Sequence, residues 1–530
     1  MKQLLITSLL ALFIFSNFYS QVNSYKNPIL PGFYPDPSVC RVGEDYYLVT
    51  SSFQFFPGVP VFHSKDLIHW KQIGHCLTRQ SQLPLEKARS SGGIYAPTIR
   101  YNNGTFYMVT TNVSGGGNFF VTSNNPAGEW SEPTWIKQGG IDPTIFFDDD
   151  GKTYFMSTGY SKDKIGIDFS EIDLKTGKIL SEIKNVWSGT GGRYPEAPHI
   201  YKVNGWYYLM VAEGGTEFGH METISRSKNI WGPYESNPDN PILTHRNISG
   251  MITQIQGTGH ADLVQAHDGS WWTVFLGFRT AGGSYHHLGR ETFLMPVQWN
   301  KEGWPFINEQ DTASLLVTTK TLPLQSTPSQ AIRDEFDNKT LDLKWNFLRN
   351  PNAATWSLME KPGCLRLKGT EVSLNDVNSP AFIGRRQQHF NFRTAASLNF
   401  DTKTNGEEAG LTLFMDEQHR YDLYLTYESG KKYVVLRYRI GSIVHEQAKV
   451  AVENPNIILS VNGTAENYTF SYQLNNLLPR IEIGKVETRY LSSEVAGGFT
   501  GVYIGLYSTG NGKMSNVPAD FDWFEYEGKE

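Results

Sequence analysis

The sequence predicts an all-β protein in which a five-bladed β-propeller precedes a β-sandwich. A strand–turn–strand pattern occurs five times within the first 280 residues. Asn-Gly and Asp-Gly pairs, which supply the positive φ values of tight hairpin turns, divide several of these strand pairs. Short alternating strands without helical periodicity fill the region after residue 333. A chain of 530 residues is too long for one ordinary core, so more than one domain is expected.

The N-terminus has the pattern of a secretory signal peptide, which we expect to span residues 1–24. Lys2 precedes an apolar run from Leu4 to Phe15, and small and polar residues follow. The run is too short to span a bilayer, and no later segment is long and apolar enough to do so. The sequence therefore predicts export to the periplasm or the extracellular space, without a membrane span.

Charge and cysteine content exclude some functions. The formal net charge is −6 and no basic block occurs, so nucleic acid is not an expected partner. The three cysteines, Cys40, Cys76 and Cys364, are widely spaced and form no CxxC motif. We interpret them as buried thiols, although a disulfide between Cys40 and Cys76 is an alternative in an exported protein.

The repeats predict that residues 25–317 form the propeller. Copies begin roughly 45 to 65 residues apart, enough for the four-stranded antiparallel sheet of a propeller blade. A sandwich built from five hairpins is the alternative. The repeated first strands begin Asp36-Pro37-Ser38-Val39, Ala96-Pro97-Thr98-Ile99, Asp142-Pro143-Thr144-Ile145, Ala197-Pro198-His199-Ile200 and Ala261-Asp262-Leu263-Val264.

The starting ends of these first strands should converge on the propeller axis. Asp36, Tyr95, Asp142, Glu196 and His260 lie there. Two carboxyl groups on either side of a sugar can hydrolyse a glycosidic bond, and a third can raise the pKa of the acid by like-charge repulsion. Each residue also has a structural interpretation. The aspartates could be turn residues before proline, the glutamate could pair with a nearby arginine, and the histidine could be a core residue.

At these residues the chain closely resembles glycoside hydrolase family 43, in its two-domain β-xylosidase and α-L-arabinofuranosidase-like branch. The resemblance extends over the mature chain. It rests on several stretches: 27–38, Phe53 with 56–59, 64–70, 91–97, 194–199, 212–216, 259–261 and 288–292.

The resemblance implies an inverting, exo-acting hydrolase that releases a terminal pentose from plant cell-wall oligosaccharides. Asp36 would be the general base, Glu196 the general acid, and Asp142 the group that orients the acid and raises its pKa. The expected activity is that of a β-D-xylosidase on xylan-derived oligosaccharides. An α-L-arabinofuranosidase acting on arabinoxylan or arabinan side chains is the alternative. No cofactor is expected for catalysis.

The resemblance also implies a set of substrate-binding residues. Arg290 would bind sugar hydroxyls, His260 would support the pocket floor, and Phe53 and Thr216 would shape the site. Tyr95 departs from the family branch, which carries tryptophan there. A smaller ring with a hydroxyl could change how the leaving sugar stacks, which bears on the choice between xylosyl and arabinosyl substrates.

Residues 318–332 are expected to be a linker and residues 333–530 a second domain. This domain resembles the concanavalin-like C-terminal domain of the same family branch. By resemblance, Phe499 would reach the mouth of the propeller and narrow the pocket; a place in the sandwich core is the alternative. Asp334 and Asp522 could bind a structural calcium ion through their carboxylates, or could lie in ordinary surface turns.

Three other functions compete with this hypothesis. A non-catalytic sugar-binding propeller would not need three acids. A retaining fructosidase would need its two carboxyl groups only about 5 Å apart, against roughly 6.5–9.5 Å for inversion. An endo-arabinanase would need an open cleft, which an appended domain reaching over the pocket disfavours. The sequence makes no prediction of oligomeric state.

Overall fold

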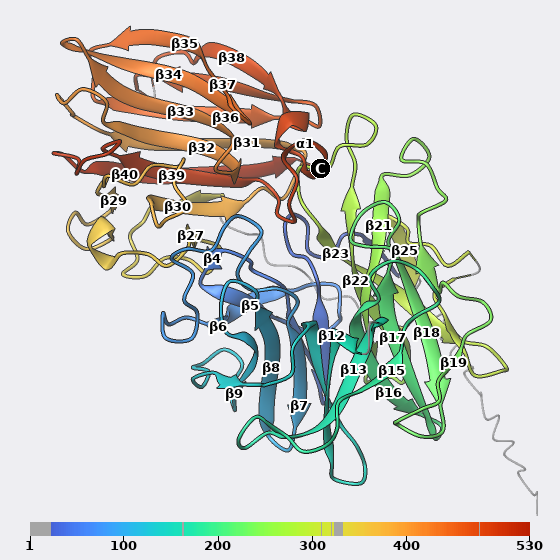
Figure 1. Ribbon diagram of the computed structural model, residues 1–530. Helices are drawn as coiled ribbons and strands as arrows, with labels where there is room; N and C mark the ends of the chain where they lie inside the picture. The colour runs from blue at the N-terminus through green and yellow to red at the C-terminus, as the bar shows by residue number, and fades with distance from the viewer. Residues whose placement is uncertain are drawn as a thin grey trace, which may run out of the picture.

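A computed structural model shows a nearly all-β protein with two bodies packed against each other (Figure 1). The structure describes residues 23–161, 164–308, 310–319, 321–322, 332–475 and 477–529. The described helices are three short turns: η1 (Ala353–Thr355), η2 (Thr488–Leu491) and α1 (Ser493–Ala496).

Five antiparallel sheets follow one another along the first 306 residues, and they confirm the predicted propeller. Each sheet has four strands in near-sequential order, and the third and fourth sheets carry one additional short strand. The sheets are β2 (Ser38–Val42), β3 (Asp45–Val49), β5 (Gly58–Ser64) and β6 (Lys71–Leu77); β7 (Thr98–Asn102), β8 (Thr105–Asn112), β9 (Gly117–Ser123) and β10 (Thr134–Trp135); β11 (Ile141–Phe147), β12 (Thr153–Ser161), β13 (Lys164–Asp173), β14 (Lys178–Ile179) and β15 (Lys184–Trp187); β16 (Glu196–Val203), β17 (Trp206–Glu213), β18 (Met221–Ser227), β19 (Glu235–Ser236) and β20 (Leu243–Thr244); β21 (Ile255–Gln265), β22 (Trp271–Arg279), β23 (Glu291–Trp299) and β24 (Pro305–Phe306).

The first strands of the five sheets form a closed ring. β2, β7, β11, β16 and β21 each lie beside the next, and β21 lies beside β2. The N-terminal segment joins the ends of the ring, because β1 (Asn23–Lys26) pairs with β25 (Leu316–Thr319) and the Asn27 side chain hydrogen-bonds both the N–H and the C=O of Leu294. Closure therefore brings the start of the first blade against the last blade.

The predicted hairpin turns are present. Asn103-Gly104 and Asn204-Gly205 have positive φ at both positions, and each connects two paired strands. Two successive positive φ values twist the turn in the same sense as the flanking strands, which explains why these dipeptides occur here.

The second body is a sandwich of two large antiparallel sheets. One sheet runs β28 (Trp356–Ser357), β29 (Leu365–Leu367), β40 (Ala519–Lys529), β31 (Asn391–Asn399), β36 (Asn456–Gly463), β37 (Asn467–Gln473) and β38 (Ile481–Glu487), with β26 (Arg333–Asp334) also on β40. The other runs β35 (Ile443–Val452), β34 (Lys431–Ile440), β33 (His419–Glu428), β32 (Glu408–Asp416), β39 (Tyr503–Thr509), β30 (Ala381–Arg386), β27 (Asn346–Leu348) and β4 (Phe55–Phe56).

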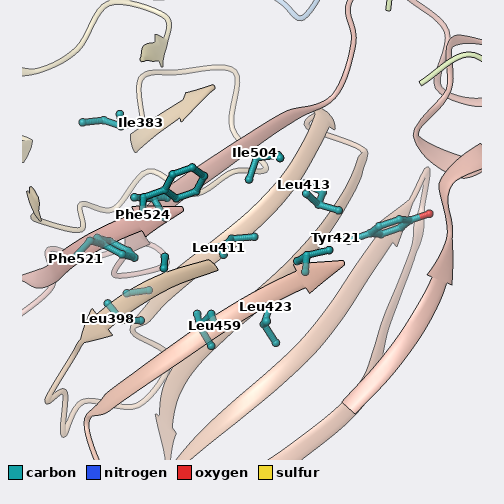
Figure 2. Packing of buried hydrophobic residues seen from close by; sticks show 14 of the residues in the cluster. Ile383, Leu398, Leu411, Leu413, Tyr421, Leu423, Leu459, Ile504, Phe521 and Phe524 are labelled. Carbon is teal, nitrogen blue, oxygen red and sulfur yellow. The ribbon is translucent and has the colours of Figure 1, made fainter. Parts of the chain in front are cut away.

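The sandwich core lies between these sheets. Figure 2 shows Leu398, Leu459 and Phe521 from one sheet close to Leu411 and Leu423 from the other. All five side chains are at most 1% exposed. Inward-facing apolar residues that alternate along the strands are the pattern by which the sequence predicted this domain.

The two bodies share a strand pairing. β4 belongs to the propeller sequence but pairs with β27, at the edge of a sandwich sheet. Phe55 of β4 stacks on Tyr503 of β39, with ring centroids 3.7 Å apart and planes 13° apart. A shared sheet and a stacked aromatic pair fix the sandwich against one side of the propeller.

Several predictions about the chain can be placed on this structure. The predicted signal peptide, except for its last two residues, and most of the predicted linker lie outside the described residues. Cys40, Cys76 and Cys364 are free thiols, as expected. Among the described helices, none has the length and apolar character needed to cross a membrane.

Candidate active site

The predicted axial residues occupy two adjacent positions of the repeat. Asp36, Asp142 and His260 all have left-handed backbone, with φ of 55°, 54° and 54°. Strand pairing resumes two residues after each, at Ser38, Thr144 and Asp262.

Glu196 and Tyr95 lie one residue earlier in the repeat, because pairing resumes three residues after each. In the fourth blade the left-handed position belongs to Ala197, with φ of 53°. The repeats in the sequence also place Tyr95 and Glu196 one residue before the position of Asp36, but they align Ala261 with Asp36, and the strand pairing corrects this to His260. Left-handed non-glycine residues are uncommon and gather at functional sites, and four lie at this position of the repeat, Ala197 included.

Asp36 is buried and held by two side chains. Its side chain accepts a 2.5 Å hydrogen bond from Ser51 Oγ at Oδ2 and a 2.6 Å hydrogen bond from Arg290 Nη1 at Oδ1. The residue is 4% exposed and Arg290 is 5% exposed. A carboxylate that receives hydrogen bonds from a guanidinium and a hydroxyl is stabilised in its charged form.

The other two carboxyl groups are biased toward the protonated form. Burial raises the pKa of Glu196 from 4.5 to about 7, and the charge of Asp36 acts in the same direction. Burial also raises the pKa of Asp142 well above its usual value, together with repulsion from Glu196 and Asp36. The three carboxyl groups repel one another when ionised, so they titrate together. Glu196 and Asp142 are the groups that favour a proton, whereas Asp36 is ion-paired with Arg290.

His260 contacts the same carboxylate from the side. Its Nδ1 lies 3.8 Å from Asp36 Oδ1, and burial lowers the pKa of the imidazole. The backbone beside it is fixed by Glu222, whose Oε2 accepts a hydrogen bond of 2.9 Å from the Ala261 N–H. A neutral, rigid imidazole is consistent with the predicted place in the pocket floor.

Arg290 connects Asp36 to both domains. Besides Asp36, Nη1 donates to Thr216 Oγ1 at 3.1 Å, and Nη2 donates to the Phe499 carbonyl at 3.5 Å. The guanidinium also lies 5.6 Å from the ring centroid of Phe53 and 5.7 Å from that of Phe499. The structure therefore brings together four of the predicted substrate-binding residues.

Phe499 enters the site because two backbones approach closely. A Cβ on Gly501 would lie 2.3 Å from the Leu288 carbonyl oxygen, so only glycine fits at that position. The Val502 N–H donates to the His287 carbonyl at 3.0 Å, and the Phe499 N–H donates to Ser91 Oγ at 2.8 Å. Phe499 is 39% exposed, so it is not a core residue of the sandwich.

Three aromatic rings pack against one another beside Arg290. Phe53 and Phe499 lie 6.2 Å apart with an interplanar angle of 30°, and Tyr95 meets Phe499 edge-on at 6.2 Å. The Tyr95 hydroxyl donates to the Ser91 carbonyl at 3.1 Å, so the tyrosine ring is held in place.

A cavity of about 510 Å³ lies between the propeller and the sandwich. Its lining includes Glu196, Thr216, Arg290 and Phe499, and also residues that the sequence did not single out: Tyr194, Glu217, Phe218, Phe278, His286 and Glu494. His286 could have been suspected from its place just before the Leu288-Gly289-Arg290 motif. Arg193, the alternative partner of Glu196, instead pairs with Glu217.

Asp334 and Asp522 are not among the residues that line this cavity, and they lie on the strands β26 and β40 of the sandwich. Both oxygens of Asp334 already accept protein hydrogen bonds, from the Phe336 N–H and from Trp345 Nε1. Across the described parts of the chain, no three His, Cys, Asp or Glu side chains are grouped to hold a metal ion. This arrangement disfavours a cation at Asp334, and calcium binding stays a prediction.

Two family models match the chain. Residues 25–305 match glycosyl hydrolases family 43, and residues 333–527 match the β-xylosidase C-terminal concanavalin A-like domain. Together they cover the propeller and the sandwich.

Relatives of full length are also found. A non-reducing end α-L-arabinofuranosidase from Bacteroides ovatus is 47% identical over 509 residues, which is 95% of this chain and 94% of that protein. A xylosidase/arabinosidase from Butyrivibrio fibrisolvens is 38% identical over 522 residues, 95% of this chain and 99% of that protein. The solved structure of Bacteroides ovatus xyloglucan PUL GH43B superposes with a TM-score of 0.92 at 46% identity, over 96% of this chain and all of that one.

Proposed function

The chain belongs to family 43 of the glycosyl hydrolases and is a glycoside hydrolase, and we propose that it removes single pentose residues from the ends of plant cell-wall oligosaccharides with inversion. Asp36 acts as the general base that activates water, and Glu196 as the general acid that protonates the leaving oxygen. Asp142 orients Glu196 and favours its protonated form.

The charges around the two residues support Asp36 as the base and Glu196 as the acid. A base must be ionised, and Arg290 and Ser51 donate hydrogen bonds to Asp36 that favour its charged form. An acid must hold a proton at working pH, and the pKa of Glu196 is raised to about 7. Glu196 is therefore suited to donate a proton, and the ion-paired Asp36 to accept one.

The observation that carries exo-action is the closure of the cavity by the sandwich. Phe499 lies against Arg290 and Phe53, so the second domain forms one wall of the cavity that Glu196 also lines. A covered pocket accepts the end of a chain, whereas cleavage within a chain requires a cleft open at both sides.

The sugar is a β-D-xylosyl residue in the main proposal. The relative from Butyrivibrio fibrisolvens is named for both xylosidase and arabinosidase activity, and a relative from Bacillus subtilis that is 34% identical is named a β-xylosidase. One observation favours an α-L-arabinofuranosyl residue as a second substrate: the 47% identical relative from Bacteroides ovatus is named for that activity.

Hydrolysis of a nitrophenyl β-D-xyloside and a nitrophenyl α-L-arabinofuranoside by the purified protein tests the proposal. We expect turnover of at least one of them, and the ratio of kcat/KM assigns the sugar. Proton NMR of the first sugar released, recorded before mutarotation, should show the anomer opposite to that of the substrate. Turnover of neither pentoside, or release of the same anomer, would overturn the proposal.

Export and calcium binding are two further proposals. The apolar run from Leu4 to Phe15 supports export, which cell fractionation with an antibody against the chain tests. Finding the full-length protein in the cytoplasm would contradict export. A melting temperature that does not change with excess calcium would contradict a calcium site.

A further inference from the structure

A histidine of the propeller and a glutamate of the sandwich meet in the wall of the cavity. The Glu494 carboxylate, on α1, accepts hydrogen bonds from His286 Nδ1 at 2.6 Å and from the His286 N–H at 3.0 Å. The His286 carbonyl in turn accepts a hydrogen bond of 3.3 Å from the Ser493 N–H. One hydrogen bond to the ring and two to the backbone therefore hold His286 from the opposite domain.

The ring plane of His286 is fixed as well. It stacks on Phe278, with centroids 4.0 Å apart and planes 17° apart, and Phe278 packs edge-on against Phe218 at 5.2 Å. His286, Phe278 and Phe218 all line the cavity, as does Glu494. A stacked and hydrogen-bonded ring has little freedom, which is what a binding group for a hydroxyl needs.

One nitrogen of this ring remains available. Glu494 engages Nδ1, and among the described residues no hydrogen bond is found at Nε2. The His286 side chain is 9% exposed, and that exposure is toward a cavity that also holds Glu196. A histidine whose Nδ1 donates to a carboxylate presents its Nε2 in a defined orientation.

We propose that His286 binds a hydroxyl of the second sugar, the unit that leaves with the oxygen protonated by Glu196. This rests on the proposed function, because it assumes that a terminal pentose occupies the space next to Asp36 and Arg290. A cavity of about 510 Å³ exceeds the needs of one pentose and falls in the range of sites for larger ligands. Glu494 is a positioning residue in this arrangement, and the sandwich contributes to the recognition of oligosaccharides through it.

The test compares two substrates with the same terminal pentose: its disaccharide, whose leaving sugar has hydroxyls, and its nitrophenyl glycoside, whose leaving group has none. His286→Phe keeps a ring to stack on Phe278 and removes the nitrogen. We expect kcat/KM to fall about tenfold more on the disaccharide than on the nitrophenyl glycoside, the cost of one hydrogen bond. Glu494→Gln should cause a smaller loss with the same preference, mainly as a higher KM for the disaccharide.

His445→Phe is the matched control, because His445 is exposed on β35 of the sandwich and lies outside the cavity. It should leave both rates unchanged. Equal losses on the two substrates in His286→Phe and Glu494→Gln would show a structural role only and overturn the inference. Turnover of neither substrate by the wild-type protein would instead refute the proposed function, and the inference with it. If His286→Phe fails to fold, as a melting curve would reveal, Glu494→Gln decides alone.

Discussion

Arg290 Nη1 donates a hydrogen bond of 2.6 Å to Asp36 Oδ1, although 254 residues separate the two in the sequence. Asp36 precedes the first strand of the first blade, and Arg290 precedes β23 of the last. Closure of the ring makes this contact, since β2 of the first blade lies beside β21 of the last. The ion pair that prepares the proposed base therefore depends on the whole propeller.

Replacement of Asp36 by asparagine should remove the base while keeping the shape of the site. We expect kcat to fall by about 10²–10⁴-fold on a nitrophenyl pentoside, because an amide cannot take a proton from water. Asp45→Asn is a suitable control, since Asp45 pairs with Lys65 at 2.8 Å on the propeller surface. A kcat within threefold of the wild-type value for Asp36→Asn would remove the role proposed for this residue.

Glu196→Gln should show a loss of rate that depends on the leaving group. A general acid matters most when the leaving oxygen is a poor leaving group, so we expect a loss of about 10³-fold on a disaccharide and a much smaller loss on a dinitrophenyl pentoside. Steady-state rates on a series of aryl pentosides would give the slope against leaving-group pKa. A slope equal to that of the wild type would contradict the assignment of Glu196 as the acid.

The pH dependence of kcat/KM should have an alkaline limb near pH 7. Burial raises the pKa of Glu196 to about 7, so the acid loses its proton as the pH rises through that value. The same pKa shift also makes the free energy of unfolding depend on pH. A carboxyl group whose folded-state pKa is raised contributes stability below its ordinary pKa of 4.5, and that contribution is lost as the pH rises through about 7.

Rate profiles and melting temperatures from pH 4 to 9 would test both statements. In Glu196→Gln the residual activity should lose the alkaline limb, and the melting temperature should fall less between pH 5 and 8 than in the wild type. An unchanged limb in that variant would mean that another group titrates.

The sequence predicted the blades because a turn is a local event. Asn103-Gly104 favours a tight turn through its own backbone preferences, and five hairpins at similar spacing leave few architectures. Which residues of the five blades occupy equivalent positions at the axis was harder to predict. The fifth copy has no proline, so Ala261 was aligned with Asp36, whereas strand pairing makes His260 the equivalent residue.

The contacts between the domains could not be predicted from the sequence. Glu494 lies on a four-residue helix with no periodic pattern, and 208 residues separate it from His286. β4 is two residues long and pairs with the other domain. Such contacts depend on how two folded domains pack against each other, and neither hydrophobic periodicity nor turn residues predict that packing. Phe499 was found only through the family resemblance.

The contacts of Arg349 with both domains lead to a prediction about stability. Arg349 is fully buried, and its guanidinium donates to the Ala88 carbonyl of the propeller at 2.5 Å, to the Asn378 carbonyl at 2.8 Å and to Glu417. Arg349→Met would leave the Glu417 carboxylate buried without its partner, which costs about 3–5 kcal/mol. We expect the melting temperature to fall by roughly 6 to 20 °C.

Two comparisons make this result specific to a buried charge. Arg79→Met removes a surface pair with Glu132, whose side chain is 58% exposed, and should change the unfolding free energy by no more than about 1 kcal/mol. The double variant Arg349→Met, Glu417→Met should recover part of the loss, because no unpaired charge remains. If Arg349→Met melts within 2 °C of the wild type, the guanidinium does not hold the two domains together, and the shared β4–β27 pairing would have to do so.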